Sequence, residues 1–205
     1  MNRHGHFDGL ARLLHWGMAV LILSMLFIGV GMMASLAWRP ALVDLHRPLG
    51  AAILVLAVIR LIHRWRSPPP PLPADLPRLQ AFAAKASHWV LYALMLAMPL
   101  IGWTMLSAGG YPVQMVGTLQ LPALVPHDPA LYAWLRGAHG VLGYTLFAVI
   151  LVHLAAALYH AWVRCDGVFE AMARSGRHEE AGARVDTAVA PTAPLEPPRT
   201  EPTQG

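Results

Sequence analysis

Residues 137–162 read GAHGVLGYTLFAVILVHLAAALYHAW, and this stretch decides the fold. It is apolar nearly throughout, and as a helix rising ~1.5 Å per residue it is long enough to cross the ~30 Å hydrocarbon core of a bilayer. It also carries His139, His153 and His160, spaced by fourteen and then seven residues. Because a helix turns ~100° per residue, all three lie within roughly 40° of one face. The first two are ~21 Å apart along the axis, which indicates two sites stacked across one membrane.

The composition of the whole chain indicates a membrane protein. Of its 205 residues, 56% are hydrophobic and 13% charged, and the mean hydropathy of +0.47 is too high for an ordinary soluble domain. The single cysteine, Cys165, excludes an intramolecular disulfide, and no C-x-x-C-H motif for covalent c-type haem occurs. The pI near 9.7 suggests nucleic acid at first, but the basic residues are placed as in a membrane protein, so no nucleic-acid partner is expected.

Four apolar segments are each long enough to span a bilayer: residues 10–37, 45–65, 83–106 and 132–162. The first is too long for the apolar region of a typical signal peptide, so we expect it to remain as a span. The expected fold class is all-α, an integral membrane four-helix bundle within residues 1–175. Residues 176–205 change to Ala, Pro, Thr and Glu, and we expect them to form a disordered cytoplasmic tail.

Lysine and arginine are distributed unevenly between the two sides of this expected bundle. One side has the N-terminus, the proline-rich connector of residues 67–80 and the end of the fourth segment. It carries most of the basic residues, namely Arg3, Arg12, Arg64, Arg66, Arg78, Lys85, Arg164, Arg174 and Arg177. The other side carries only Arg39, Arg47 and Arg136. Because basic residues favour the cytoplasmic side, both termini are expected in the cytoplasm.

Four histidines pair by depth in this topology. His46 and His139 begin the second and fourth segments on the periplasmic side, whereas His15 and His153 lie in the cytoplasmic half of the first and fourth. Two imidazoles that face each other across a bundle core supply the two axial ligands of a haem iron. Polar groups in lipid are costly and tend to be functional. The pattern therefore predicts haem held between helices at two iron sites, His46 with His139 and His15 with His153.

Three further side chains are candidates in the cytoplasmic layer. His88 and His160 lie near the cytoplasmic ends of the third and fourth segments. Each is either an interfacial residue or a contact of the cytoplasmic haem or a quinone, and by depth either one competes as a ligand of that haem. Arg60 follows His46 by fourteen residues and shares its helix face. It either snorkels to the interface or pairs with a haem propionate or a quinone oxygen. In the third segment, Gly102 either admits a flat macrocycle or serves helix packing.

Four stretches of the sequence are similar to one known family. They read ARLLHWGMAVLIL, LHRPLGAAILVLAVIRLIHRW, SHWVLYALMLAMPLIGW and HGVLGYTLFAVILVHLAAALYHAWVRCDGV, and together they cover residues 10–168. In them the chain resembles the bacterial cytochrome b561 family, which also includes b-type subunits of nickel–iron hydrogenases. The resemblance implies a four-helix membrane bundle with two non-covalent b haems, and it implies ligands at His15, His46, His139 and His153. It also implies electron exchange with ubiquinol and, for some members, oxidation of superoxide at the periplasmic face.

Two histidine ligands leave no iron position open, so the haems are expected to relay electrons and not to bind oxygen. We therefore expect a cytochrome of the bacterial inner membrane, surrounded by lipid. It would pass electrons between ubiquinol or ubiquinone and a periplasmic partner, either superoxide or a redox protein. As an enzyme it would be a superoxide:ubiquinone oxidoreductase. The alternatives are an anchor subunit of a hydrogenase or dehydrogenase complex, and a metal-ion transporter that uses histidines.

Overall fold

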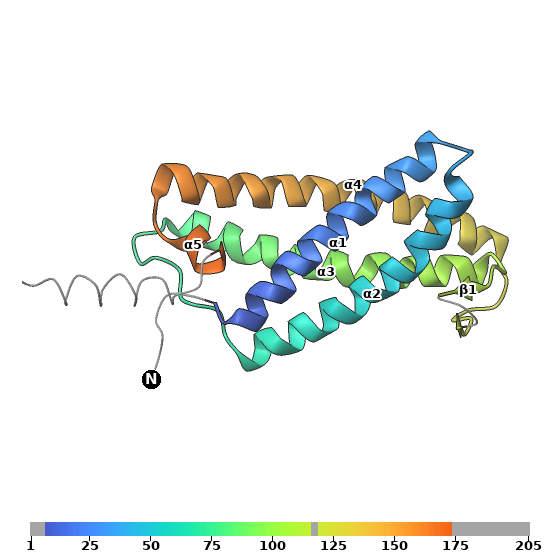
Figure 1. Ribbon diagram of the computed structural model, residues 1–205, viewed down its shortest axis with the longest axis horizontal. Helices are drawn as coiled ribbons and strands as arrows, with labels where there is room; N and C mark the ends of the chain where they lie inside the picture. Colours follow the sequence, from blue (N-terminus) through green and yellow to red (C-terminus); the bar gives the residue numbers. More distant parts are fainter. Residues whose placement is uncertain (1–6, 116–118, 174–205) are drawn as a thin grey trace, which may run out of the picture. The chain divides into compact units, whose positions relative to one another are not determined.

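A computed structural model describes residues 7–115 and 119–173 of the chain (Figure 1). In chain order these residues form α1 (Gly9–Ala34), α2 (Arg39–Arg66), α3 (Arg78–Ala108), β1 (Val113–Gln114), β2 (Gln120–Leu121), α4 (Pro129–Tyr159), a π-helical turn (His160–Arg164) and α5 (Val168–Ala173). The expected tail, residues 176–205, lies outside the described residues.

Four of the described helices are long and apolar enough to cross a membrane: α1, α2, α3, and α4 together with its π-helical turn. Large apolar side chains lie on their outer faces, and Phe27, Tyr144 and Trp162 are each 76% exposed. So much apolar surface suits contact with lipid, where the helices satisfy their own backbone hydrogen bonds. The expected all-α membrane bundle is confirmed.

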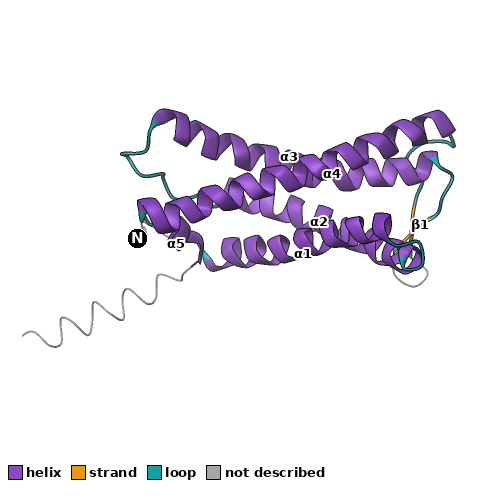
Figure 2. Cartoon of the chain, turned by 90° about the horizontal axis from the view of Figure 1, so that it is seen from above, coloured by secondary structure: helices purple, strands orange, loops and turns teal. Residues whose placement is uncertain are grey.

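The four long helices pack as two pairs that share one core. α1 packs on α2 and α3 packs on α4, while α2 also contacts α3 and joins the pairs (Figures 1 and 2). All four helices contribute to the buried core, through side chains such as Met18, Ile53, Tyr92 and Leu146. Because the helices run back and forth, residues far apart in the sequence meet at the same depth.

The two ends of the bundle differ. We call the end formed by residues 67–77 and α5 the connector end, and the end formed by residues 35–38 and the β1–β2 hairpin the hairpin end. The hairpin pairs Val113 with Leu121 in antiparallel register. At the connector end, the indole nitrogen of Trp16 donates a hydrogen bond of 3.3 Å to the carbonyl of Met172, which ties α5 to α1.

The helix ends differ from the expected ranges where polar turns flank the apolar runs. Asp8 caps α1 by accepting a hydrogen bond of 2.7 Å from the backbone of Ala11, and the helix stops before the extended Ser35. The expected first segment, 10–37, runs past this point because hydropathy counts the apolar residues of the reversing turn. α2, α3 and α4 begin before the expected positions because their first turns lie beyond the hydrocarbon-sized run.

Candidate functional site

Two histidines face each other near the hairpin end. His46 of α2 and His139 of α4 have ring centroids 6.2 Å apart, with the ring planes at 66°. The Nδ1 atoms of both rings are buried, and neither finds a hydrogen-bond partner among the described residues. Because a buried polar nitrogen without a partner is costly, these two rings suit a ligand that bonds to nitrogen.

A second pair of histidines lies nearer the connector end. The rings of His15 on α1 and His153 on α4 have centroids 6.3 Å apart, with the ring planes at 65°. His153 follows His139 by fourteen residues on the same helix, which is a rise of ~21 Å. The structure thus brings together the two pairs that were expected from depth, one in each half of the bundle.

The separation within each pair fits an iron atom between the two rings. A metal–imidazole bond is about 2 Å long, and each ring nitrogen lies roughly 1 Å from its centroid, so two rings on opposite sides of one metal are separated by roughly 6 Å. Both observed centroid separations, 6.2 and 6.3 Å, match this value. The residues present therefore fit two iron centres with two histidines each, the ligation found in electron-carrying haem.

Gly102 of α3 lies directly against the hairpin-end pair. A β-carbon at this position would come 3.3 Å from Cε1 of His139 and 3.7 Å from its Nδ1. The first distance is tighter than ordinary van der Waals contact, so the absence of a side chain lets α3 approach this ring. Gly102 thus lies on the face of α3 that meets the hairpin-end pair.

His88 of α3 lies beside the connector-end pair. Its ring centroid is 5.3 Å from that of His153, at an interplanar angle of 78°. This separation is shorter than in either of the other pairs and suits edge-to-face contact better than an iron between the rings. The Nδ1 of His88 donates a hydrogen bond of 2.7 Å to the carbonyl of Ala84, which leaves its Nε2 as an acceptor.

His160 belongs to a separate network in the π-helical turn. Its Nδ1 lies 2.7 Å from Oδ2 of Asp166, and Arg164 donates to the same oxygen through Nε at 2.9 Å. Arg164 also reaches Asp75 of the connector at 2.7 Å. Partial burial raises the pKa of the Asp166 carboxyl, but the hydrogen bonds from Arg164 and His160 outweigh it and hold that pKa below its usual range. His160 is thus held through Nδ1, with only Nε2 available to another group.

Arg60 contacts two side chains of neighbouring helices. Its Nη2 lies 2.8 Å from Nδ1 of His15, and its Nε donates a hydrogen bond of 3.1 Å to the hydroxyl of Tyr92. Tyr92 is 5% exposed and belongs to the shared core. The guanidinium group is therefore fixed against a histidine of the connector-end pair.

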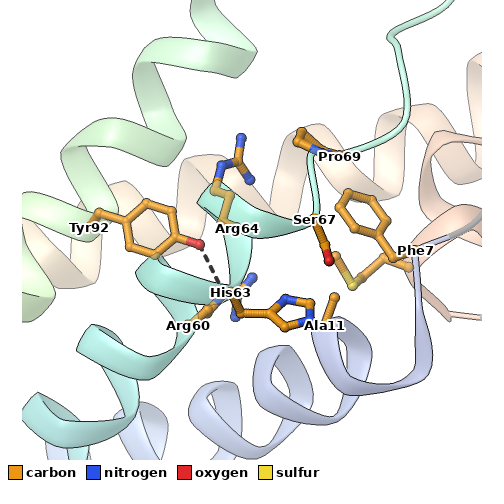
Figure 3. A pocket seen from close by; sticks show the side chains of 9 residues that line it. Phe7, Ala11, Arg60, His63, Arg64, Ser67, Pro69 and Tyr92 are labelled. Atoms are coloured by element: carbon orange, nitrogen blue, oxygen red, sulfur yellow. Dashed lines mark hydrogen bonds between the residues drawn. The ribbon is translucent and has the colours of Figure 1, made fainter.

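A small pocket opens beside Arg60 at the connector end (Figure 3). Its free volume is about 20 Å³, which is room for about one water-sized group. It is lined by Phe7, Ala11, Arg60, His63, Arg64, Ser67, Pro69, Tyr92 and Met172. Spacing was the one sequence signal for Tyr92 and Arg64, because each follows a candidate residue, His88 or Arg60, by four positions and so shares its helix face.

The chain is similar to one protein family and to several known proteins. The family model for prokaryotic cytochrome b561 matches residues 6–175. The chain is 28% identical to cytochrome b561 homolog 2 of Escherichia coli (strain K12), over 77% of this chain and 86% of that protein. It is 31% identical to the probable superoxide oxidase CybB of Yersinia pestis, over 75% of this chain and 87% of that protein. It is also 28% identical to cytochrome b561 homolog 1 of E. coli, over 75% and 88%.

The match covers all four spanning helices and both histidine pairs. The resemblance noted in the sequence is thereby confirmed, and the chain is a multi-pass membrane protein. The chain belongs to the prokaryotic cytochrome b561 family, whose members are membrane cytochromes that carry b-type haem.

Proposed function

We propose that this cytochrome holds two b haems and passes electrons across the bacterial inner membrane, between ubiquinol or ubiquinone and a periplasmic partner. The observation that carries this proposal is the presence of two histidine pairs, at 6.2 and 6.3 Å, in the two halves of one bundle. His46 and His139 hold one haem, and His15 and His153 hold the other. Haem ligated by two histidines supplies one-electron transfer, and its iron has no open position for oxygen.

The proposed orientation places the connector end in the cytoplasm. This end carries the larger number of basic residues, as the positive-inside rule requires. Arg64 and Arg66 close α2 there, Arg78 opens α3, and Arg164 closes the π-helical turn. The hairpin end, with Arg39, Arg47 and Arg136, then faces the periplasm.

The cytoplasmic layer offers hydrogen-bonding groups for a quinone. His88 lies against His153, and its Nε2 can accept a hydrogen bond from a quinol hydroxyl. Arg60 and His160 are further candidates of the same layer, although the structure engages both with neighbouring side chains. The apolar outer faces of the helices would let a lipid-soluble quinone approach from within the bilayer.

The periplasmic layer is suited to an anion. The Nε of Arg47 is buried and has no hydrogen-bond partner among the described residues, and its nearest carboxylate, Asp44, is 3.9 Å away. Arg47 also adjoins the proposed ligand His46 in the sequence. Positive groups beside a redox centre raise the local concentration of an anionic donor such as superoxide. The name of the Yersinia pestis relative, a probable superoxide oxidase, agrees with this substrate.

The test uses the purified protein in proteoliposomes. A dithionite-reduced minus oxidised spectrum should show a b-type Soret difference, and haem extraction should give two haems per chain. Ubiquinol should reduce both haems, and superoxide should reduce them in protein freed of quinol. The absence of any Soret band would refute the cytochrome reading and favour a metal-ion transporter. If the protein holds two haems that ubiquinol cannot reduce, the proposed electron exchange with quinone is refuted. That result would favour an anchor subunit that exchanges electrons with a protein partner.

A further inference from the structure

Two arginines of the connector end lack a carboxylate partner. Arg60 and Arg64 are one turn apart on α2, and among the described residues no Asp or Glu forms an ion pair with either. Like charges at this spacing repel each other. A cation such as Arg60 within a membrane span is costly unless it meets a counter-charge. Arg60 and Arg64 thus place two positive charges side by side, and among the described residues no carboxylate pairs with either, since Asp8 lies 3.5 Å from His63 instead.

Tyr92 holds both guanidinium groups in place. Their central carbons lie 5.9 Å (Arg60) and 5.8 Å (Arg64) from the centroid of the Tyr92 ring, within the range of cation–π attraction. Its hydroxyl also accepts the hydrogen bond from Nε of Arg60. Figure 3 shows the tyrosine of α3 reaching across to Arg60 and Arg64 on α2. A buried ring that orients two cations indicates a built site and not two chance surface charges.

The contact between Arg60 and His15 cannot persist when His15 ligates iron. A guanidinium only donates hydrogen bonds, so the His15 nitrogen that it meets must carry a lone pair. In a neutral imidazole the other nitrogen then carries the proton, and a protonated nitrogen cannot bind a metal. The conclusion is the same whichever way the ring is turned. Ligation through His15 therefore takes away one acceptor of Arg60 and leaves it bonded to Tyr92.

We propose that Arg60 and Arg64, positioned by Tyr92, bind the propionate carboxylates of the haem held by His15 and His153. This inference rests on the proposed ligation by those two histidines. The haem brings two carboxylates of its own to the layer where two unpaired guanidinium groups lie. Guanidinium–carboxylate pairs are strong, planar and often bidentate. When the haem is bound, Arg60 thus donates to a propionate oxygen in place of the His15 nitrogen.

The pocket beside Arg60 and Arg64 is small, with a free volume of about 20 Å³, and it offers further polar groups. Ser67 and His63 line the same pocket and add hydrogen-bonding groups beside the two arginines.

The experiment compares haem-loaded protein with its variants Arg60→Leu, Arg60→Lys, Arg64→Leu and Tyr92→Phe. Arg66→Leu, an exposed arginine of the same helix end, is the matched control. Redox titration in quinone-free detergent gives the midpoint potential of each haem. Infrared redox-difference spectra of protein whose haem propionates carry ¹³C report the carboxylate environment directly.

Removal of either guanidinium should lower the potential of one haem, the same haem for Arg60→Leu and Arg64→Leu, because a positive charge favours the reduced form. A tenfold change in the reduction equilibrium, which is 59 mV for one electron, is expected for each. The labelled carboxylate bands should shift in both variants and stay in place in Arg66→Leu. Arg60→Lys should retain most of the parent potential, and Tyr92→Phe should shift it in the same direction by less.

Unchanged labelled bands in the two leucine variants would overturn the proposal, whatever the potentials do. A raised KM for ubiquinol with an unchanged potential would assign the arginines to quinone instead. If the bands that shift do not carry the haem label and respond to anionic lipid in nanodiscs, the two arginines bind a lipid phosphate instead. If the leucine variants lose haem, the infrared difference spectra of Arg60→Lys and Tyr92→Phe test the proposal in their place. If His15→Ala retains both haems, the failure lies in the proposed ligation and not in the arginine site.

Discussion

At the scale of single residues, three imidazoles crowd the connector-end layer, and their hydrogen bonds differ. His88 donates Nδ1–H to Ala84 and so presents an unprotonated Nε2, a state common among metal-ligating histidines. His15 instead meets Arg60. Hydrogen bonding alone therefore favours His88, whereas the 6.3 Å separation favours His15 over the 5.3 Å of His88 as the partner of His153. Distance is the stronger criterion, because a hydrogen bond can be exchanged but an iron needs a fixed space between two rings.

The first prediction follows from this choice of ligands. Replacement of His15 or His153 by alanine should remove one haem of two, and replacement of His46 or His139 should remove the other. Under the proposed ligation, each change would delete one of the two histidines that hold a haem. Haem-to-protein ratios and low-temperature difference spectra of the four variants measure the outcome.

His88→Ala is the matched control, because His88 touches His153 without fitting an iron between the rings. It should retain both haems and change only the spectrum of one. If His88→Ala removes a haem and His15→Ala does not, the cytoplasmic pair is misassigned. If His15→Ala and His46→Ala abolish the same spectral component, the pairing by depth is wrong.

At the scale of helices, the approach of α3 to α4 depends on glycine. A side chain at Gly102 would press on His139, at 3.3 Å for the β-carbon alone. The second prediction is that Gly102→Leu displaces this ring and lowers the content of the hairpin-end haem by half or more, while the other haem remains. Gly102→Ala should have a small effect, since a shift of a few tenths of an ångström accommodates one methyl group. Difference spectra of the two variants provide the measurement.

Gly143 supplies the control for this prediction. It also lies where α4 meets α3, but a β-carbon there would be 3.8 Å from the end of the Met98 side chain, an ordinary contact. Gly143→Ala should therefore retain both haems. Equal loss of haem in Gly143→Ala and Gly102→Leu would indicate general damage to the helix interface, and not a clash at His139.

The π-helical turn gives a prediction about stability. The side chain of Asp166 is 10% exposed and joins His160 to Arg164, whereas that of Asp75 is 75% exposed. Exposed ion pairs contribute little, and buried charge-assisted hydrogen bonds contribute more. Asp166→Asn should lower the thermal unfolding midpoint by roughly 2–4 °C. Asp75→Asn should leave it within error, and equal shifts in differential scanning fluorimetry would contradict this account.

The same carboxylate predicts a dependence of stability on pH. The pKa of Asp166 in the folded protein is below its usual value, so Asp166 stabilises the fold at every pH above the ordinary aspartate range near ~3.9. This contribution is lost as the pH falls below that range toward the lowered folded pKa. Thermal midpoints of the parent and Asp166→Asn, measured between pH 3 and 7, should therefore converge at the acid end. A constant difference across this range would mean that the pKa of Asp166 is the same in the folded and unfolded protein.

At the scale of the whole molecule, the two ends of the bundle carry different numbers of basic residues. The proposed periplasmic end offers Arg47, whose Nε lacks an acceptor among the described residues. Reduction of the haems by superoxide should slow as salt rises, because the attraction between exposed charges is screened over about 10 Å at 0.1 M salt. Arg47→Ala should lower this rate severalfold and weaken its dependence on salt. Stopped-flow absorbance of quinol-free protein gives both quantities.

Arg66→Ala, at the opposite end of the same helix, is the control for this last prediction. It removes the same charge without altering the proposed anion site, so the rate with superoxide should be unchanged. Equal losses of the rate with superoxide in the two variants would mean that this rate depends only on the net charge of the protein. A rate that depends on neither arginine nor salt would leave a neutral or protein partner as the periplasmic donor or acceptor.

The sequence by itself determined the bundle and the approximate depth of its polar groups. Apolar runs of membrane-spanning length can satisfy their backbone only as helices in lipid, so the fold class follows from hydropathy. The rise of a helix is fixed, so His139 and His153 had to lie ~21 Å apart. These properties are local, because each depends on one segment and its own periodicity.

Only the tertiary structure decided which side chains meet within a layer. His15, His88 and His160 were equivalent by depth as partners of His153. Contacts between helices put His15 at 6.3 Å and His88 at 5.3 Å from it, whereas the turn after α4 puts His160 on Asp166. The contact of Tyr92 with Arg60 and Arg64 likewise depends on packing, because Tyr92 lies on α3 and both arginines lie on α2. Depth follows from position along one helix, whereas contact depends on the rotation and crossing of helices, which packing between segments sets and no single segment encodes.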